Sequence, residues 1–201
     1  MIDGNITGKE WEERVIQLFK QKDFEILRLE SKGKNNPRII DFYVHNKSLF
    51  HDGLLCEVKS INVSGFDEDI NGQVSSKDKT FLEAISIDNL DNTKRTLRKH
   101  EYTYDEEGLI RDIATKLVDA QDQYNRSELG KFNIDKQKRP FVVILCFDYV
   151  FFQERINYRK ILSDFTTISA IYTLGMDKSD EFIIYPNSHA NILLEQKHYR
   201  C

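Results

Sequence analysis

The sequence predicts an α/β fold in which a central mixed β-sheet is flanked by helices. Three observations carry this prediction. Helical periodicity near the N-terminus is followed by three β-type segments, and a second helical stretch precedes another apolar segment. That segment, PFVVILCF at residues 140–147, is a continuous apolar run of the length expected for a strand buried on both faces, so it belongs in the centre of the sheet.

The first 61 residues are expected to form one helix and three strands. Apolar side chains at helical spacing predict an amphipathic helix over residues 8–22: Trp11, Val15, Leu18 and Phe19. Bulky and β-branched residues between polar turns predict strands at 24–30, 38–45 and 54–61. Turn-forming pairs between residues 46 and 53 let the last two strands pair antiparallel.

Residues 62–106 interrupt this pattern with glycines, serines and many charges, and we interpret them as an insertion in a single domain that spans residues 1–201. A helix is then predicted at 107–126, with a stripe in which one polar residue stands among apolar ones: Ile110, Ala114, Leu117, Gln121 and Tyr124. After the central strand we expect a helix at 153–165 and strands at 167–174 and 181–185.

Composition and charge exclude several classes of protein. No stretch approaches the ~18 consecutive apolar residues of a membrane span, and no basic segment followed by an apolar run opens the chain, so we expect a cytoplasmic protein that does not contact membranes. Three widely spaced cysteines, Cys56, Cys146 and Cys201, fit neither a disulfide framework nor a zinc site. The net charge of -4 argues against a protein that coats polyanions, but allows an acidic site that meets phosphates through a divalent cation.

Two charges interrupt the apolar strand GLLCEVKSI at residues 53–61. Because side chains alternate along a strand, Glu57 and Lys59 project to one face while Cys56 and Val58 project to the other. Burying either charge alone would be unfavourable. The two side chains therefore lie at the solvent edge of the core, pair with each other, or surround a bound ion.

The preceding strand adds a second carboxylate. Antiparallel pairing brings Asp41 beside Glu57, and a hard divalent cation with oxygen ligands would relieve the repulsion between the two acids. The E-x-K spacing alone is not specific, since it also occurs at residues 30–32 and 195–197. Only the copy at 57–59 lies within an apolar strand that follows a strand bearing an aspartate.

These residues resemble the PD-(D/E)XK nuclease superfamily, whose members share the restriction-endonuclease-like fold. The resemblance rests on Pro37-Arg38-Ile39-Ile40-Asp41, on Glu57-Val58-Lys59, and on Gly8, Trp11-Glu12 and Val15 in the preceding helix. The expected order of helix, three-stranded meander, helix and strand is similar to the αβββαβ core of that fold. The chain departs from the pattern in the three residues between Pro37 and Asp41 and in the long insertion.

The resemblance implies a metal-dependent nuclease. Asp41, Glu57 and the backbone carbonyl of Val58 would ligate Mg²⁺ or Mn²⁺, and Lys59 would position or activate the attacking water. Such a cation polarises the scissile phosphate and acidifies bound water, which suits phosphodiester hydrolysis.

Two further residues are candidates for the same site. Glu12 would orient water or metal, and it is favoured over Glu10 and Glu13 because it flanks Trp11, which must turn inward. Gln121 is a candidate because it is polar on an otherwise apolar stripe, although a core-edge amide bonded to backbone is the alternative interpretation.

Nucleic acid is the expected partner, with DNA favoured over RNA. Many nucleases of the resembled type cut both strands as homodimers, but no stretch of the sequence identifies a dimer interface, and the oligomeric state stays open. The basic cluster at residues 94–100 is either a backbone contact or a solvated charge run. Two alternatives to a nuclease stay open. One is a catalytically inactive nuclease-fold module that binds nucleic acid or a protein, and the other is a structural protein whose strand charges form only an ion pair.

Overall fold

A computed structural model describes residues 7–29, 39–47, 49–61, 67–68, 79–91, 94–147, 156–175 and 181–195. The chain divides into two compact units, one made of residues 1–61 and 113–201 and the other of residues 62–112. In the first unit a six-stranded sheet has the order β1-β2-β3-β7-β8-β9. Its strands are β1 (Phe24–Arg28), β2 (Phe42–Asn46), β3 (Leu49–Ile61), β7 (Phe141–Phe147), β8 (Ala170–Gly175) and β9 (Ile183–Pro186).

The sheet is mixed, which confirms the predicted α/β class. β3 pairs parallel with β7, and β7 pairs parallel with β8, whereas the other neighbouring strands are antiparallel. The predicted central strand is correct, because β7 has neighbours on both edges and every one of its residues is buried. A strand covered on both faces needs no polar alternation, and this explains its continuous apolar sequence.

The first helix, α1 (Gly8–Gln21), forms as predicted. Its start is fixed by a capping box, in which the Thr7 hydroxyl accepts from the backbone N–H of Glu10 while the Glu10 carboxylate accepts from the backbone N–H of Thr7. Trp11, Val15 and Phe19 are fully buried against one face of the sheet. That face also contains Cys56 and Cys146.

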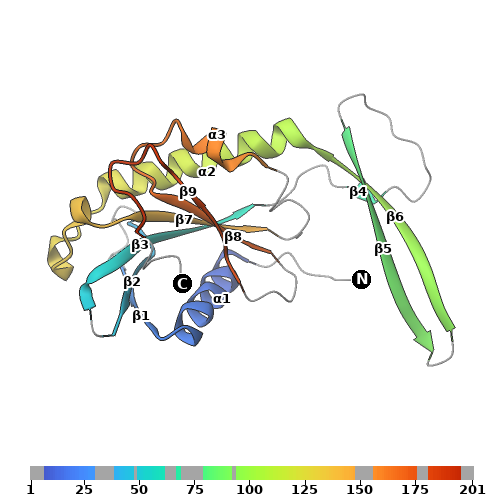
Figure 1. Cartoon of the computed structure of the whole chain (residues 1–201), viewed down its shortest axis with the longest axis horizontal. Coiled ribbons are helices and arrows are strands. Elements are labelled where there is room, and N and C mark those ends of the chain that lie inside the picture. The colour runs from blue at the N-terminus through green and yellow to red at the C-terminus, as the bar shows by residue number, and fades with distance from the viewer. Residues whose placement is uncertain are drawn as a thin grey trace. The chain divides into compact units, whose positions relative to one another are not determined.

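The opposite face of the sheet is covered by α2 (Glu106–Arg126) and α3 (Tyr158–Leu162), as Figure 1 shows. The ring of Tyr158 in α3 lies 4.4 Å from that of Tyr185 in β9, and Lys59 of β3 reaches Gln123 of α2. Alternation along β3 therefore sends Cys56 and Val58 toward α1 and sends Glu57 and Lys59 toward α2, as the sequence predicts.

The second unit contains three strands, β4 (Asp67–Glu68), β5 (Lys79–Asp91) and β6 (Lys94–Asp105), paired antiparallel in the order β4-β6-β5. Most of it is one long hairpin, with β5 running opposite β6. The basic cluster at residues 94–100 belongs to β6, but its side chains lie outside the described part of the chain.

Several predicted boundaries are wrong. β3 begins at Leu49 rather than 54, because Asn46 pairs with Leu49 and the hairpin connection is only two residues long. Asp41 precedes β2 instead of lying in it. The helix predicted at 153–165 is reduced to α3, since Asn157 caps its first turn and the helix ends at Leu162; residues 153–155 lie outside the described ranges.

The prediction of which face of α2 is buried was also wrong. The buried apolar side chains are Leu109, Ile113, Leu117 and Ala120, whereas Ile110 is exposed. Among the helices in the described ranges, none combines the length and the apolar character needed to cross a bilayer.

Gly53 fills a position that no other residue fits. A Cβ atom there would lie 2.5 Å from the Val44 carbonyl oxygen and 2.6 Å from the Tyr43 ring. We expect Gly53→Ala to lower the free energy of unfolding by about 1–3 kcal/mol, because neither backbone nor a buried ring can move away. Urea denaturation measures this. Gly130→Ala is the matched control, since nothing lies within 4 Å of its added Cβ, and an equal loss in both variants would contradict the prediction.

Candidate active site

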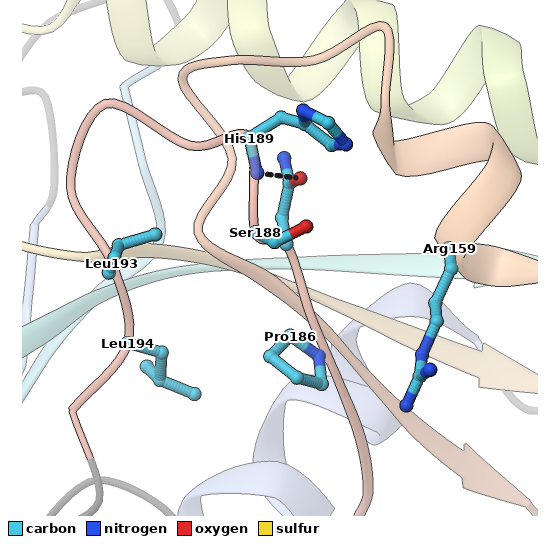
Figure 2. A pocket seen from close by; sticks show the side chains of 7 residues that line it. Arg159, Pro186, Ser188, His189, Leu193 and Leu194 are labelled. Atoms are coloured by element: carbon cyan, nitrogen blue, oxygen red, sulfur yellow. Dashed lines mark hydrogen bonds between the residues drawn. The ribbon is translucent and has the colours of Figure 1, made fainter.

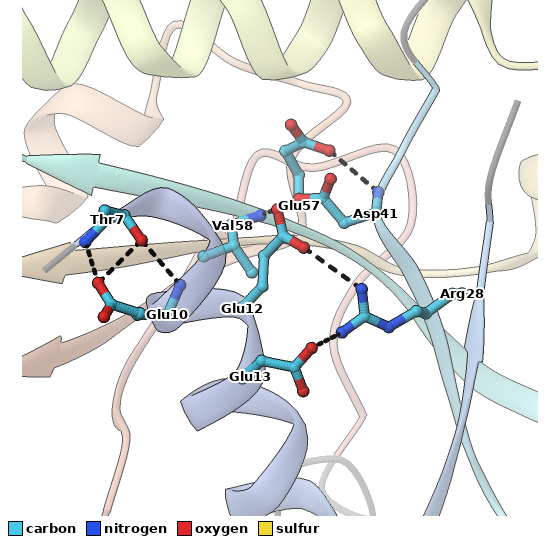
Figure 3. Close-up of polar contacts among 8 residues, drawn as sticks. All are labelled: Thr7, Glu10, Glu12, Glu13, Arg28, Asp41, Glu57 and Val58. Carbon is cyan, nitrogen blue, oxygen red and sulfur yellow. Dashed lines mark hydrogen bonds and ion pairs between the residues drawn. The ribbon is translucent and has the colours of Figure 1, made fainter.

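A polar cavity of about 350 Å³ lies where the start of α1, the segment before β2, the second half of β3 and one face of α2 meet. Its charged and amide-bearing lining residues are Glu12, Asp41, Glu57, Lys59, Lys116, Asp119 and Gln123. Figure 3 shows Asp41, Glu57 and Glu12 gathered above the first turns of α1. All candidate residues named from the sequence except Gln121 line this cavity, Val58 included.

Backbone N–H groups hold the carboxylates of both Asp41 and Glu57. The backbone N–H of Asp41 donates to Glu57 Oε2 at 3.2 Å, and the backbone N–H of Val58 donates to Asp41 Oδ2 at 2.8 Å. This reciprocal arrangement places both carboxylates on the same side of the hairpin. It also explains why Asp41 lies just outside β2, since its N–H is directed to a side chain instead of to a neighbouring strand.

Lys59 completes the buried cluster. Its Nζ lies 2.8 Å from Glu57 Oε1 and donates to Gln123 Oε1 at 2.5 Å. The Glu57 side chain is 2% exposed and that of Lys59 is 11% exposed. Of the three arrangements that the sequence left open for Glu57 and Lys59, a position at the solvent edge is thus excluded. The two side chains pair with each other, and this pairing is compatible with an ion bound beside them.

The electrostatic environment favours protonation of the carboxyl groups. Burial, together with the charge of Asp41, raises the pKa of Glu57 to about 8, and the attraction of Lys59 opposes this shift only in part. Burial and Asp41 also raise the pKa of Glu12, with Arg28 acting in the opposite direction. The charged forms of Glu57 and Glu12 are therefore disfavoured first by burial and then by the charge of Asp41.

Of the three glutamates in the first turns of α1, Glu12 is the one that lines the cavity. Glu10 is used in the capping box with Thr7, and Glu13 forms an ion pair with Arg28 (Figure 3). Arg28 also lies 3.7 Å from Glu12, so it holds this side chain at the edge of the site.

Gln121 lies elsewhere on α2, and Gln123 takes the place that was predicted for it. Two residues correspond to about 200° of helix rotation, so the two amides face nearly opposite directions. The Gln121 Oε1 atom is buried and has no hydrogen-bond partner among the residues that the structure describes. The missed signal is a polar stripe at helical spacing, Lys116, Asp119 and Gln123, which runs along one side of the buried apolar residues of α2.

The end of α2 supports this site through one hydroxyl group. The backbone N–H of Ile40 donates to Ser127 Oγ at 3.1 Å, and this hydroxyl donates to the carbonyl oxygen of Gln123 at 2.7 Å. Lys136 closes the same helix end, donating from Nζ to the carbonyl oxygens of Tyr124, Asn125 and Ser127. The Ser127 hydroxyl thus connects the residue before Asp41 to the backbone of Gln123. Pro37 and Arg38, which also carry the sequence resemblance, lie outside the described residues.

The charge of the cavity fits a divalent cation. Four carboxylates, on Glu12, Asp41, Glu57 and Asp119, face two ammonium groups, on Lys59 and Lys116, which leaves an excess of two negative charges when all are ionised. Within the described ranges no three acidic, histidine or cysteine side chains gather closely enough to enclose a metal by themselves. A cation held here would have two carboxylates with backbone oxygen and water as donors, a set that Mg²⁺ commonly uses.

Comparison with known proteins identifies no relative. No protein-family model matches the chain, and neither the curated proteins nor the solved structures include a match.

Proposed function

We propose that this chain is a metal-dependent nuclease that hydrolyses phosphodiester bonds, with DNA the favoured substrate and a restriction-endonuclease-like core. The observation that carries the proposal is the meeting of Asp41, Glu57 and Lys59 in one buried cavity of suitable charge. The order of α1, the β1–β3 meander, α2 and β7 supports the same proposal, because it agrees with the αβββαβ core expected from the sequence.

Each residue would contribute a separate function. Asp41, Glu57 and the Val58 carbonyl would hold Mg²⁺ or Mn²⁺, which when bound supplies a Lewis acid and lowers the pKa of coordinated water. Lys59 would orient the attacking water, since its amine lies beside Glu57 and is aimed by Gln123. Glu12 would accept a hydrogen bond from a water at the edge of the site.

The test is cleavage of a panel of plasmid, linear, single-stranded and branched DNA, with RNA alongside, in Mg²⁺, Mn²⁺ or EDTA. We expect cleavage that requires metal and that falls at least about 1,000-fold in Lys59→Ala, because the water loses its positioning group. Circular dichroism checks that this variant is folded. Cleavage that persists in Lys59→Ala would overturn the assignment of the site.

One observation favours a second candidate. Because Lys59 already neutralises Glu57 in the absence of metal, the cluster is also compatible with a nuclease-fold module that binds nucleic acid or a protein without turnover. Isothermal titration with Mn²⁺ separates the two functions. A chain that binds no Mn²⁺ and cuts no member of the panel is the inactive module.

Gln123 provides a prediction that sequence reasoning alone did not reach. Gln123→Leu removes the amide that holds Lys59, and we expect it to slow cleavage roughly 10- to 100-fold while metal binding is retained. Gln121→Leu is the matched control on the same helix. It removes a buried, unpartnered oxygen and should leave cleavage unchanged without lowering thermal stability. Equal rates for the two variants would show that Gln123 has no part in the reaction.

A further inference from the structure

A second cavity, of about 450 Å³, lies beside the edge strand β9 and shares no lining residue with the candidate active site. Its volume falls in the range of about 300–1,000 Å³ that is usual for small-molecule sites. Arg159 of α3 lines one side, and the end of β9 together with the segment after it supplies the rest of the wall (Figure 2).

A buried amide side chain fixes the loop that lines this cavity. Asn187 is 3% exposed, and its Nδ2 lies within hydrogen-bond distance of the carbonyl oxygens of Leu162, Phe165 and Ile168. Its Oδ1 accepts from the backbone N–H of His189 at 2.9 Å. The loop that carries Ser188 and His189 is thereby fixed to the end of the helix that carries Arg159, so the cavity is preformed.

The polar part of the wall consists of hydrogen-bond donors. Ser188 and His189 line the cavity side by side, and Arg159 lines it from α3 (Figure 2). Within the described ranges no hydrogen bond or ion pair joins any of these three side chains to another side chain, although the His189 backbone N–H donates to Asn187 Oδ1. None of the described lining residues is acidic. A guanidinium group in such a setting selects an anion, and separate guanidinium, hydroxyl and imidazole groups suit the three terminal oxygens of a phosphate better than a planar carboxylate.

The remaining wall is apolar. Pro186 and Leu194 line it, and Leu193 leaves 56% of its surface exposed at the same cavity. An exposed leucine has no significance alone, but here it adjoins a cluster of anion-binding donors. The ligand therefore combines an anionic group with an apolar or planar body.

We infer that this cavity binds a phosphate monoester of mononucleotide size, with the phosphate on Arg159, Ser188 and His189 and the body against Pro186, Leu193 and Leu194. The inference does not depend on the proposed nuclease activity. The cavity differs in charge from the candidate active site, which is rich in carboxylates and would repel a free phosphate when metal is absent.

Isothermal titration of the whole chain with dAMP in EDTA tests the inference, with deoxyadenosine and inorganic phosphate as partial ligands. We expect dAMP to bind with a dissociation constant below about 1 mM and each partial ligand at least about 10-fold more weakly. Inorganic phosphate or deoxyadenosine binding as tightly as dAMP would overturn it, as would the absence of dAMP binding.

Variants locate the ligand. Arg159→Met should weaken dAMP binding roughly 10- to 100-fold, and Leu193→Asn about 3- to 10-fold, while Lys160→Met, on the next residue of α3, should not change it. Arg159 and Leu193 are exposed, so neither change removes a core contact. If Lys116→Met abolishes binding and Arg159→Met does not, dAMP occupies the candidate active site and the inference is wrong.

Discussion

Asp41→Asn is expected to reduce metal-dependent cleavage at least about 1,000-fold and, in the metal-free protein, to raise the free energy of unfolding by about 1 kcal/mol. Activity falls because the site loses a charged ligand. At a pH above about 8, where Glu57 is ionised, stability rises because residue 41 no longer repels this buried carboxylate, while the asparagine oxygen can still accept the Val58 N–H. A single atom is thus expected to change function and stability in opposite directions.

Cleavage assays in Mg²⁺ and urea denaturation in EDTA measure the two effects. Glu13→Gln is the control, because this neighbouring acid is 52% exposed, pairs with Arg28 and does not line the cavity. It should change neither quantity. A variant at Asp41 that cuts at the wild-type rate would show that this carboxylate holds no metal. A lower free energy of unfolding would show that its main function is structural.

Glu57→Gln is expected to remove a pH dependence of stability from the metal-free protein. The folded-state pKa of Glu57 is raised to about 8 from an ordinary value of 4.5, so the folded chain binds a proton that the unfolded chain releases between these values. Its contribution to stability is fully present below pH 4.5 and is lost as the pH rises toward 8. The slope is at most about 1.4 kcal/mol per pH unit, and it falls to zero within about one pH unit above 8.

Chemical denaturation at a series of pH values in EDTA checks this sign. Wild type should lose stability between pH 5 and about 8 relative to Glu57→Gln, whereas Glu13→Gln should follow the wild type. Mg²⁺ should restore wild-type stability near pH 8 and should have no such effect on Glu57→Gln, because a neutral amide does not replace the lost ligand. Parallel curves for wild type and Glu57→Gln would contradict the raised pKa.

The parts of the fold that sequence could predict are those with a strong, simple period. β7 is apolar at every position, and this predicted its central place in the sheet. β3 alternates around two charges, and this predicted that Glu57 and Lys59 share one face. The amphipathic pattern of α1 was equally clear, and Trp11 placed Glu12 rather than its neighbours at the site.

The face of α2 was harder to predict because its apolar residues are sparse. At 100° per residue, a stripe through Ile110 and one through Leu109 differ by a single step, and only packing against the sheet decides between them. Because the wrong stripe was predicted to face the sheet, Gln121 was predicted at the site in place of Gln123. Antiparallel β5 and β6 carry so many charged residues that no alternating pattern indicated a hairpin.

The Ile40–Ser127 hydrogen bond has a consequence for the order of events during synthesis. It joins residues 87 positions apart, and the parallel pairing of β3 with β7 likewise waits for residues beyond 140. Contacts of such long sequence separation form late, after the loop between them has closed. A nascent chain that has exposed only Asp41, Glu57 and Lys59 therefore has the reactive groups but not the support that aligns them. If the chain cuts nucleic acid, it becomes competent to do so only after the residues of β7 have been synthesised.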